Sequence, residues 1–415
     1  MKKIIISVII ILIISSMSGM VAYGEPENCF GYDFMETFVT NYAARDAGTE
    51  GEAAAAEYLA EYFSTNGLSP YSTENAENQY LVPFDFVNPN NKRIYTSQNV
   101  AGIKYGVNTS GKQIIIGAHY DSVKNPIGIA ITGGDGAYDN GSGVGALAQI
   151  ISELQGVELS VDIIFVAFGA EELGLFGSKY MAENMSEEQI NNTILMINID
   201  SIAAGDYLYL YTDEVRNSQE DYMISTANAM GIDLQPVPDN KKTYPVADEY
   251  SGLSYTHDLL LSDQSSFMKI GIDVALFVGY NLEDPIDIPR ESTENPNIMH
   301  TTNDTMAKML ELYGSQVNTR INNVALIVNE YVTNPEITSI MAESHNRKYD
   351  YHKLMNETML MGLSLSIKAV VLLLFILIGY KLMKKEKNII DVNNNDKVEE
   401  IKTPEEAFIY EDLRI

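Results

Sequence analysis

The sequence predicts an α/β protein with a mostly parallel mixed central sheet and helices on both faces. Two observations favour this fold class. Short, continuous apolar runs at residues 113–116, 161–168 and 194–199 are typical of buried strands. The segments between them, such as residues 143–154, carry apolar residues at helical spacing. Strands that alternate with helices form mostly parallel sheets, and those helices cover the two faces.

The remaining elements follow from the same periodicities. Residues 32–67 carry aromatic and apolar residues at helical spacing, interrupted by a turn-rich link, and Gly67 marks a helix end. Three further helical patterns lie at residues 173–181, 219–230 and 305–331. Strand-like runs lie at residues 80–86, 100–105, 207–211 and 273–278. The polar stretch at residues 235–257, rich in Pro and Tyr, indicates a loop that rims the site.

The N-terminus has the pattern of an export signal. Met1 and two lysines precede an apolar run at residues 4–14, and small residues follow at positions 22–24. We therefore expect a signal peptide at residues 1–24, with an uncleaved anchor as the alternative. In both cases the segment that follows is exported.

A second apolar run, at residues 363–382, is long enough to cross a bilayer, which takes about 20 residues. A lysine cluster follows at once, so the positive-inside rule places that end in the cytoplasm. The same cluster argues against a buried core helix. We expect one folded domain at residues 25–340, a juxtamembrane connection at 341–362, a transmembrane helix at 363–383 and a tail at 384–415. The protein would then be a single-pass cell-membrane protein with an extracellular domain and a cytoplasmic tail.

Charge and cysteine content exclude several classes of function. The formal net charge is −30, which disfavours nucleic acid as a partner because phosphate binding requires positive charge. Solubility explains the acidity, and attraction of cationic peptide N-termini is the alternative. Cys29 stands alone, so the chain forms no intrachain disulfide and offers no cysteine cluster for a metal.

Acidic and imidazole side chains follow the predicted buried strands. His119, Glu171 with Glu172, and Asp200 each come at or just after the end of one strand, and Asp139 precedes the helix at 143–154. His300 arrives a hundred residues later. Ligands of open α/β sheets bind beyond the carboxyl ends of the strands, so these side chains are expected to meet there.

This set of side chains suits two divalent ions. Two ions about 3.5–4 Å apart need one bridging carboxylate, and each ion needs a further carboxylate and a histidine. The available ligands are His119, Asp139, Glu172, Asp200 and His300, all of types that zinc accepts. Glu171 is placed to act as a general base, and Asp121 to accept the other N–H of the His119 ring. Each motif alone has an ordinary alternative, such as a helix cap at residues 139–143, and only their combination is informative.

The motifs in this order resemble the zinc metallopeptidase family of the secreted bacterial leucyl-type aminopeptidases. That family also includes glutaminyl cyclases, glutamate carboxypeptidase and the transferrin-receptor ectodomain. The resemblance covers residues 45–331 and includes the segments 48–59 and 262–267. It implies a zinc-exopeptidase fold of the phosphorylase/hydrolase-like type, and a dinuclear zinc peptidase domain at residues 25–340.

Carried over by position, the resemblance makes Asp139 the bridging ligand of two Zn²⁺ ions. It pairs His119 with Asp200 on one ion and Glu172 with His300 on the other. It also makes Glu171 the general base and Asp121 the partner of the histidine. Two positions depart from the family pattern: Met299 stands where some members have an oxyanion-stabilising tyrosine, and Gln264 where His is common.

The sequence therefore predicts a membrane-anchored extracellular zinc aminopeptidase that removes N-terminal residues from peptides with a free N-terminus. Glutaminyl cyclisation or carboxypeptidase action on the same fold is the alternative within enzymes. An inert, receptor-like homologue is the alternative from a different class, and the complete ligand set argues against it.

Overall fold

The computed structural model describes residues 29–71, 78–107, 111–125, 133–212, 218–238, 245–246, 254–255, 260–282 and 298–336. The predicted signal peptide, transmembrane helix and tail lie outside these residues, as does most of the predicted rim at 235–257. Within the described ranges, no helix has both the length and the apolar character needed to cross a bilayer.

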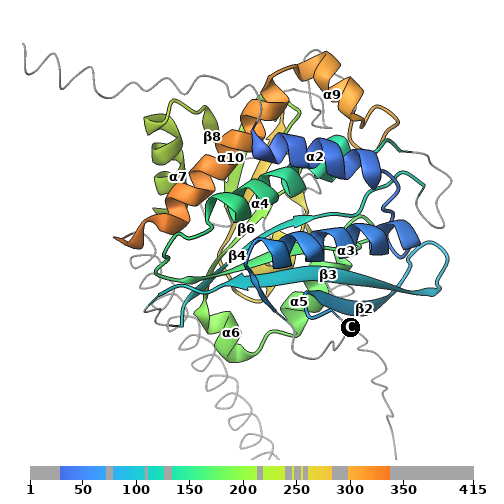
Figure 1. Cartoon of the computed structure of the whole chain (residues 1–415), viewed down its shortest axis with the longest axis horizontal. Helices are drawn as coiled ribbons and strands as arrows, with labels where there is room; N and C mark the ends of the chain where they lie inside the picture. Colours follow the sequence, from blue (N-terminus) through green and yellow to red (C-terminus); the bar gives the residue numbers. More distant parts are fainter. Residues whose placement is uncertain are drawn as a thin grey trace, which may run out of the picture. The chain divides into compact units, whose positions relative to one another are not determined.

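A mixed nine-stranded sheet forms the centre of the described part of the chain (Figure 1). Its four central strands run parallel, in the order β5 (Asp162–Phe168), β4 (Gln113–His119), β6 (Thr193–Ile199) and β11 (Val274–Tyr280). The pairings that join these four to the flanking strands are antiparallel: β3 (Ile94–Lys104) with β5, and β7 (Tyr207–Thr212) with β11. The predicted α/β class with a mixed central sheet is confirmed.

Short strands complete the two sides of the sheet. On one side, β1 (Ser69–Pro70) and β2 (Leu81–Val87) both pair antiparallel with β3. On the other, β8 (Leu234–Pro236) pairs parallel with β7. A separate pair joins β9 (Pro245–Val246) to β10 (Ser254–Tyr255).

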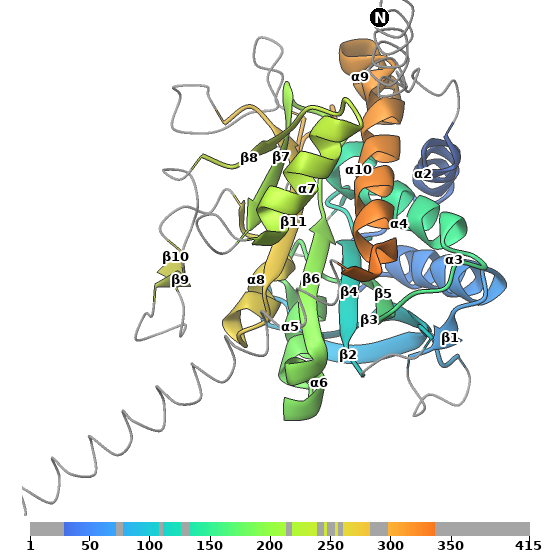
Figure 2. The same cartoon turned by 90° about the vertical axis from the view of Figure 1, so that its left-hand side faces the viewer.

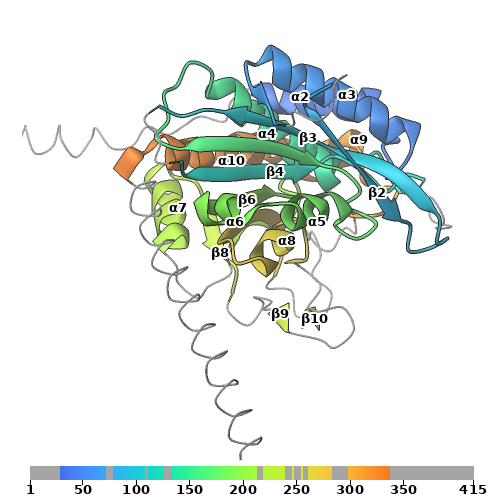
Figure 3. The same cartoon turned by 90° about the horizontal axis from the view of Figure 1, so that it is seen from below.

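Helices cover both faces of the sheet, as predicted. One face carries α2 (Phe30–Asn41), α3 (Glu50–Thr65), α4 (Ser142–Glu153), α7 (Ser218–Ala229) and α10 (Gln316–Thr333) (Figures 1 and 2). The other carries α5 (Phe176–Glu183), α6 (Glu187–Asn192) and α8 (Gln264–Lys269) (Figure 3). Alternate residues of β4 belong to different core clusters, with Ile114 and Ile116 on one face and Ile115 on the other. A strand that is buried on both faces reads as a continuous apolar run, which explains the sequence pattern.

The predicted long helix at 305–331 is two helices. Gly314 has a φ of 52°, and it separates α9 (Met306–Tyr313) from α10. A positive φ suits glycine because it has no Cβ, so the chain turns here although the apolar spacing continues. The predicted helix at 173–181 also starts late, at Phe176, because residues 171–175 form a turn closed by hydrogen bonds to the carbonyl of Glu171.

Candidate metal centre

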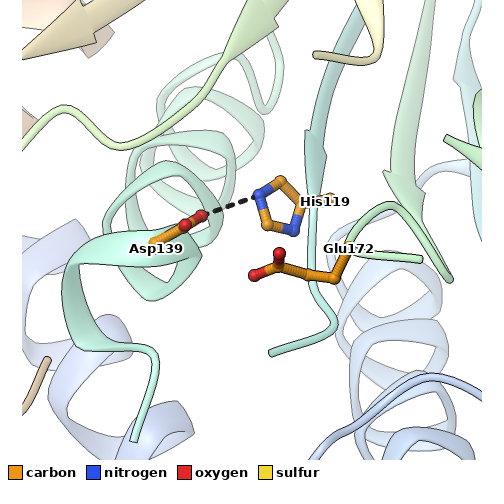
Figure 4. A group of neighbouring side chains, drawn as sticks. All are labelled: His119, Asp139 and Glu172. Atoms are coloured by element: carbon orange, nitrogen blue, oxygen red, sulfur yellow. Dashed lines mark ion pairs between the residues drawn. The ribbon is translucent and has the colours of Figure 1, made fainter. Parts of the chain in front are cut away.

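The carboxyl ends of the three parallel strands β4, β5 and β6 bring the predicted side chains together. His119 is the last residue of β4, Glu171 and Glu172 follow β5, and Asp200 follows β6. Asp139 comes from the turn η1 (Ala137–Gly141), directly before α4. Asp139, His119 and Glu172 point toward one another in Figure 4. His300 completes the group from the segment before α9.

Asp139 lies between the two histidines. Its Oδ1 atom is 3.0 Å from His119 Nε2, and its Oδ2 atom is 3.1 Å from His300 Nε2. Asp200 Oδ1 lies 3.3 Å from the same His119 nitrogen. Glu172 Oε2 lies 3.0 Å from the same His300 nitrogen. The side chains therefore form two half-sites that share one carboxylate.

The spacing of these donor atoms fits metal ligation. Two donors on one tetrahedral zinc, each about 2.0–2.2 Å from the ion, lie about 3.3 Å apart. The contacts of 3.0–3.3 Å between imidazole nitrogens and carboxylate oxygens are close to that separation. Glu172 Oε1 is buried and has no hydrogen-bond partner among the described residues. A buried carboxylate oxygen without a donor is costly, and a cation would satisfy it.

The buried acids repel each other where no cation separates them. Burial, followed by the charge of Asp139, raises the pKa of Glu172 to about 7, and burial raises the pKa of Glu171 well above its ordinary value. Burial opposes ionisation of Asp139 as well, but hydrogen bonds from His119 and His300 outweigh it and lower its pKa. Glu172 is the main cause that raises the pKa of His300 to about 12. This excess of carboxylates suits a centre that holds divalent cations.

Asp121 holds the turn that carries the two glutamates. Its Oδ1 atom accepts the backbone N–H of Glu171 at 3.0 Å, and its Oδ2 atom accepts that of Glu172 at 3.2 Å. Its contact with the His119 ring is longer, at 3.5 Å from Nδ1. The sequence led us to expect Asp121 on the histidine, whereas its short hydrogen bonds go to the glutamate turn.

Two further side chains hold the backbone just before Glu171. The sequence analysis assigned no role to either. Glu52 Oε1 accepts the backbone N–H of Ala170 at 3.0 Å, and Asn99 Oδ1 accepts that of Gly169 at 3.1 Å. Four consecutive N–H groups, from Gly169 to Glu172, thus donate to side-chain oxygens. A signal for Glu52 exists in the sequence, because it lies on the same helical stripe as the buried Ala55, Ala56 and Leu59.

Asp304 and Arg45 support the turn that carries Asp139. Asp304 accepts the backbone N–H groups of Tyr138 at 2.6 Å and Asp139 at 3.1 Å. Arg45 is fully buried and donates to the carbonyls of Asp135 at 2.7 Å and Gly136 at 2.6 Å. Neither residue has a local signal, since the partners named here lie 90 or more positions away, except that Asp304 closely follows His300.

Three non-glycine residues at this centre have a positive φ. Ala170, Ser201 and His300 have positive φ values of 50°, 54° and 57°. Each is a site residue or directly precedes or follows one. Non-glycine residues with positive φ are uncommon and persist where surrounding contacts hold them, which is typical of functional sites.

A pocket of about 340 Å³ opens over these side chains. One part of its wall is acidic and imidazole, and another part is apolar and includes Leu260, Leu276, Val278, Tyr280 and Met299. The Tyr280 hydroxyl lies 3.0 Å from the sulfur of Met299, the residue that departs from the family pattern. Gln264, the other departure, accepts from Asn198 and donates to the carbonyl of Leu260, so it joins β6 to the pocket wall.

A family model matches residues 99–322, more than half of the chain, and its description is Peptidase family M28. The chain belongs to this family. The resemblance inferred from the motifs is therefore confirmed. The predicted enzyme class, a metallo-aminopeptidase hydrolase, agrees with the aminopeptidases among the M28 relatives.

Two relatives show how far the similarity of this M28 chain extends. Aminopeptidase YwaD of Bacillus subtilis (strain 168) is 30% identical over 224 residues, which cover 54% of this chain and 44% of that protein. The alkaline phosphatase isozyme conversion protein of Escherichia coli (strain K12) is 27% identical over 263 residues, which cover 58% of this chain and 72% of that protein. The chain thus spans less than half the length of the first.

A solved structure shows the same fold. BSAP, a zinc aminopeptidase from Bacillus subtilis, aligns with a TM-score of 0.53 and 19% identity. The alignment covers 74% of this chain and 96% of that one.

Proposed function

We propose that this M28 peptidase is a dinuclear zinc aminopeptidase anchored in the cell membrane with its catalytic domain outside. The observation that carries the proposal is the position of Asp139, whose two oxygens face His119 and His300 at 3.0 and 3.1 Å. One carboxylate shared between two histidines is the arrangement that a two-ion site needs. His119 and Asp200 would complete the coordination of one ion, and Glu172 and His300 would complete that of the other.

The residues of the centre divide the chemistry among them. Bound zinc supplies a Lewis acid for the scissile carbonyl and promotes deprotonation of water. Glu171 takes a proton from the attacking water and returns it to the departing amine. Burial raises the pKa of Glu171, which favours its acceptance of a proton. Asp121 and Glu52 fix the turn from which Glu171 acts.

The shape of the pocket supports removal of an apolar first residue. Its acidic side neutralises the free α-amine of the substrate, while the side formed by Leu276, Val278 and Met299 buries the first side chain. Burying a leucine-sized side chain contributes about 1.5–3 kcal/mol. An N-acetylated peptide lacks the charge that the acidic side would neutralise.

The sequence supports the location. The export signal at residues 1–24 and the apolar run at 363–382 with its lysine cluster favour one membrane span with the peptidase domain outside. Digestion of intact cells with an added protease tests this orientation. Loss of the peptidase domain with retention of the tail supports it, and protection of the domain contradicts it.

The function is tested with the purified full-length chain and added Zn²⁺. One peptide with an N-terminal leucine is offered in free and N-acetylated forms, and released amino acid and bound metal are measured. Release from the free form alone, with two zinc ions per chain, supports the proposal. Release of the C-terminal residue would favour a carboxypeptidase, no turnover at all would favour the cyclase or the inert homologue, and either result would refute the proposal.

A further inference from the structure

A second pocket adjoins the catalytic one. Its volume is about 230 Å³, and it lies between α5 and α8, which run side by side in Figures 2 and 3. Three residues, Gly174, Leu175 and Leu261, line both pockets. The two pockets therefore meet directly beyond the turn that carries Glu171 and Glu172.

The walls of this second pocket are held in place. The hydroxyls of Ser178 in α5 and Ser266 in α8 lie 2.9 Å apart within hydrogen-bonding distance, and both serines are buried. Gly177 packs so closely that an added Cβ would come within 2.3 Å of Asn99 Oδ1. The serine contact joins α5 to α8, and the close approach of Gly177 to Asn99 holds α5 against β3, so buried contacts fix the wall that α5 contributes.

The charge of the second pocket is opposite to that of the first. Lys179 and Lys269 both line it, and burial together with the nearby charge of Lys269 lowers the pKa of Lys179. Lys179 Nζ donates to the carbonyl of Gly174 at 2.7 Å, and an ammonium has three donors in all. Glu183 lines the pocket as well, so the local balance is one positive charge in a chain of net charge −30.

The two pockets have different side chains, so each suits a different part of the substrate. The apolar side chains Leu276, Val278 and Met299 line only the catalytic pocket, and the lysines line only the second. A peptide whose first side chain lies on the apolar wall places its cleaved bond at the acidic centre. The portion that leaves after cleavage then extends past Gly174 and Leu175, toward the lysines.

We propose that the pocket between α5 and α8 binds a carboxylate on the leaving portion of the substrate. That carboxylate is either the C-terminus of a short peptide or the side chain of an acidic residue after the first one. This inference rests on the proposed aminopeptidase function and narrows its substrate class. A carboxylate relieves the repulsion between the two ammonium groups, which a neutral group cannot do.

The test compares matched substrates on the full-length zinc-loaded chain. Leu-Ala-Ala is compared with its C-terminal amide, and Leu-Glu-Ala-amide with Leu-Gln-Ala-amide, so that the two sources of the carboxylate are separated. We expect KM to be about fivefold lower for the charged member of at least one pair, the size of one exposed ion pair. In a Lys179→Met/Lys269→Met variant this difference should vanish, while kcat/KM for the two uncharged peptides, Leu-Ala-Ala-amide and Leu-Gln-Ala-amide, stays unchanged.

Lys308→Met is the matched control, because it removes a lysine that pairs with Glu311 on α9, at 3.0 Å, and lines neither pocket. It should keep the preference. Equal KM values within both pairs, or a preference that persists in the double lysine variant, overturn the inference even when the enzyme is active. If no peptide is hydrolysed, the proposed function fails. Calorimetric binding of the same four peptides then tests separately whether the pocket with Lys179 and Lys269 binds a carboxylate.

Discussion

Asp304 holds Asp139 through the backbone. Its carboxylate accepts the N–H of Asp139 at 3.1 Å and the N–H of the preceding residue at 2.6 Å, and it is buried. The shared carboxylate of the candidate metal centre thus depends on a second acid, which binds the backbone of Asp139. Mutation of a residue that orients a metal ligand in this way typically lowers metal affinity tenfold to a hundredfold.

We therefore expect Asp304→Asn to weaken zinc binding by about tenfold or more. The asparagine amide offers one acceptor oxygen, so one of the two backbone N–H groups would face an NH₂ group, at a cost of about 1–3 kcal/mol. Zinc titration and urea unfolding measure the two effects. Asp135→Asn is the matched control, because its half-buried carboxylate pairs with Lys124 and it should change stability by less than about 0.5 kcal/mol. Unchanged zinc affinity in Asp304→Asn would refute the role.

Glu52 predicts a pH dependence of stability. Burial raises its pKa from 4.5 to about 8, so the folded chain binds a proton at Glu52 over a range in which the unfolded chain has released it. Stability from this group is complete below pH 4.5 and is lost as the pH rises toward 8. In Glu52→Gln this loss is absent, so the fall in the free energy of unfolding between pH 5 and 8 should be smaller by a few kcal/mol. Urea unfolding of the chelator-treated chain measures it, and parallel curves for both proteins would contradict the assignment.

Glu52→Gln should also lower turnover. The Glu52 side-chain oxygens accept hydrogen bonds from Ser97, Gly48 and Ala170, and the amide of glutamine offers only one oxygen. With the amide nitrogen at the Oε2 position, its NH₂ group faces the N–H of Gly48, and at the Oε1 position Ala170 loses its acceptor. Either orientation weakens the support of the turn that carries Glu171. We expect kcat to fall about tenfold with KM nearly unchanged, since misplacing a catalytic group affects the reaction more than binding. Steady-state kinetics on a leucyl peptide measure both constants, and a change in KM alone would point to a different role.

Local sequence patterns predict where the buried strands end and which site residues follow them. They do not predict which side chains hold those strand ends in place. A run such as residues 113–119 is buried on both faces, so its apolar composition marks it directly, and the acid or imidazole at its end is visible in the sequence. The capping box of α6, Ser186 with Gln189, was equally visible and was missed, because the helix has only six residues and no buried face.

The supporting residues could not be found in this way. Glu52 meets Ala170 across 118 positions, and Asp304 meets Asp139 across 165. A buried acid at helical spacing indicates that it has a partner, but only the sheet order shows which one. The break at Gly314 is the opposite case, since the apolar spacing continues through it while the backbone turns.

Glu171→Gln tests the division between chemistry and metal binding. The amide keeps the size of the side chain but cannot accept the proton of the attacking water, so we expect kcat to fall at least about a thousandfold while two zinc ions stay bound. Glu172→Gln is the matched comparison, because its carboxylate faces His300 at 3.0 Å and its loss should reduce the metal count. Normal turnover in Glu171→Gln would show that another residue acts as the base. So would loss of zinc from Glu171→Gln but not from Glu172→Gln, because Glu171 would then be a metal ligand.

Removal of the metals should destabilise the domain. Without cations, the carboxylates of Glu172 and its buried neighbours repel each other, and ionising Glu172 is unfavourable enough to raise its pKa to about 7. Zinc at a thousand times its Kd contributes about 4 kcal/mol to stability, so chelation should lower the Tm by several degrees and re-addition of Zn²⁺ should restore it. The shift should be larger at pH 8 than at pH 6, because Glu172 loses its proton between the two. Asp139→Asn removes a charge from the shared ligand, so its Tm should respond much less to zinc. A wild-type Tm that is indifferent to chelator and zinc at both pH values would show that this centre does not bind metal.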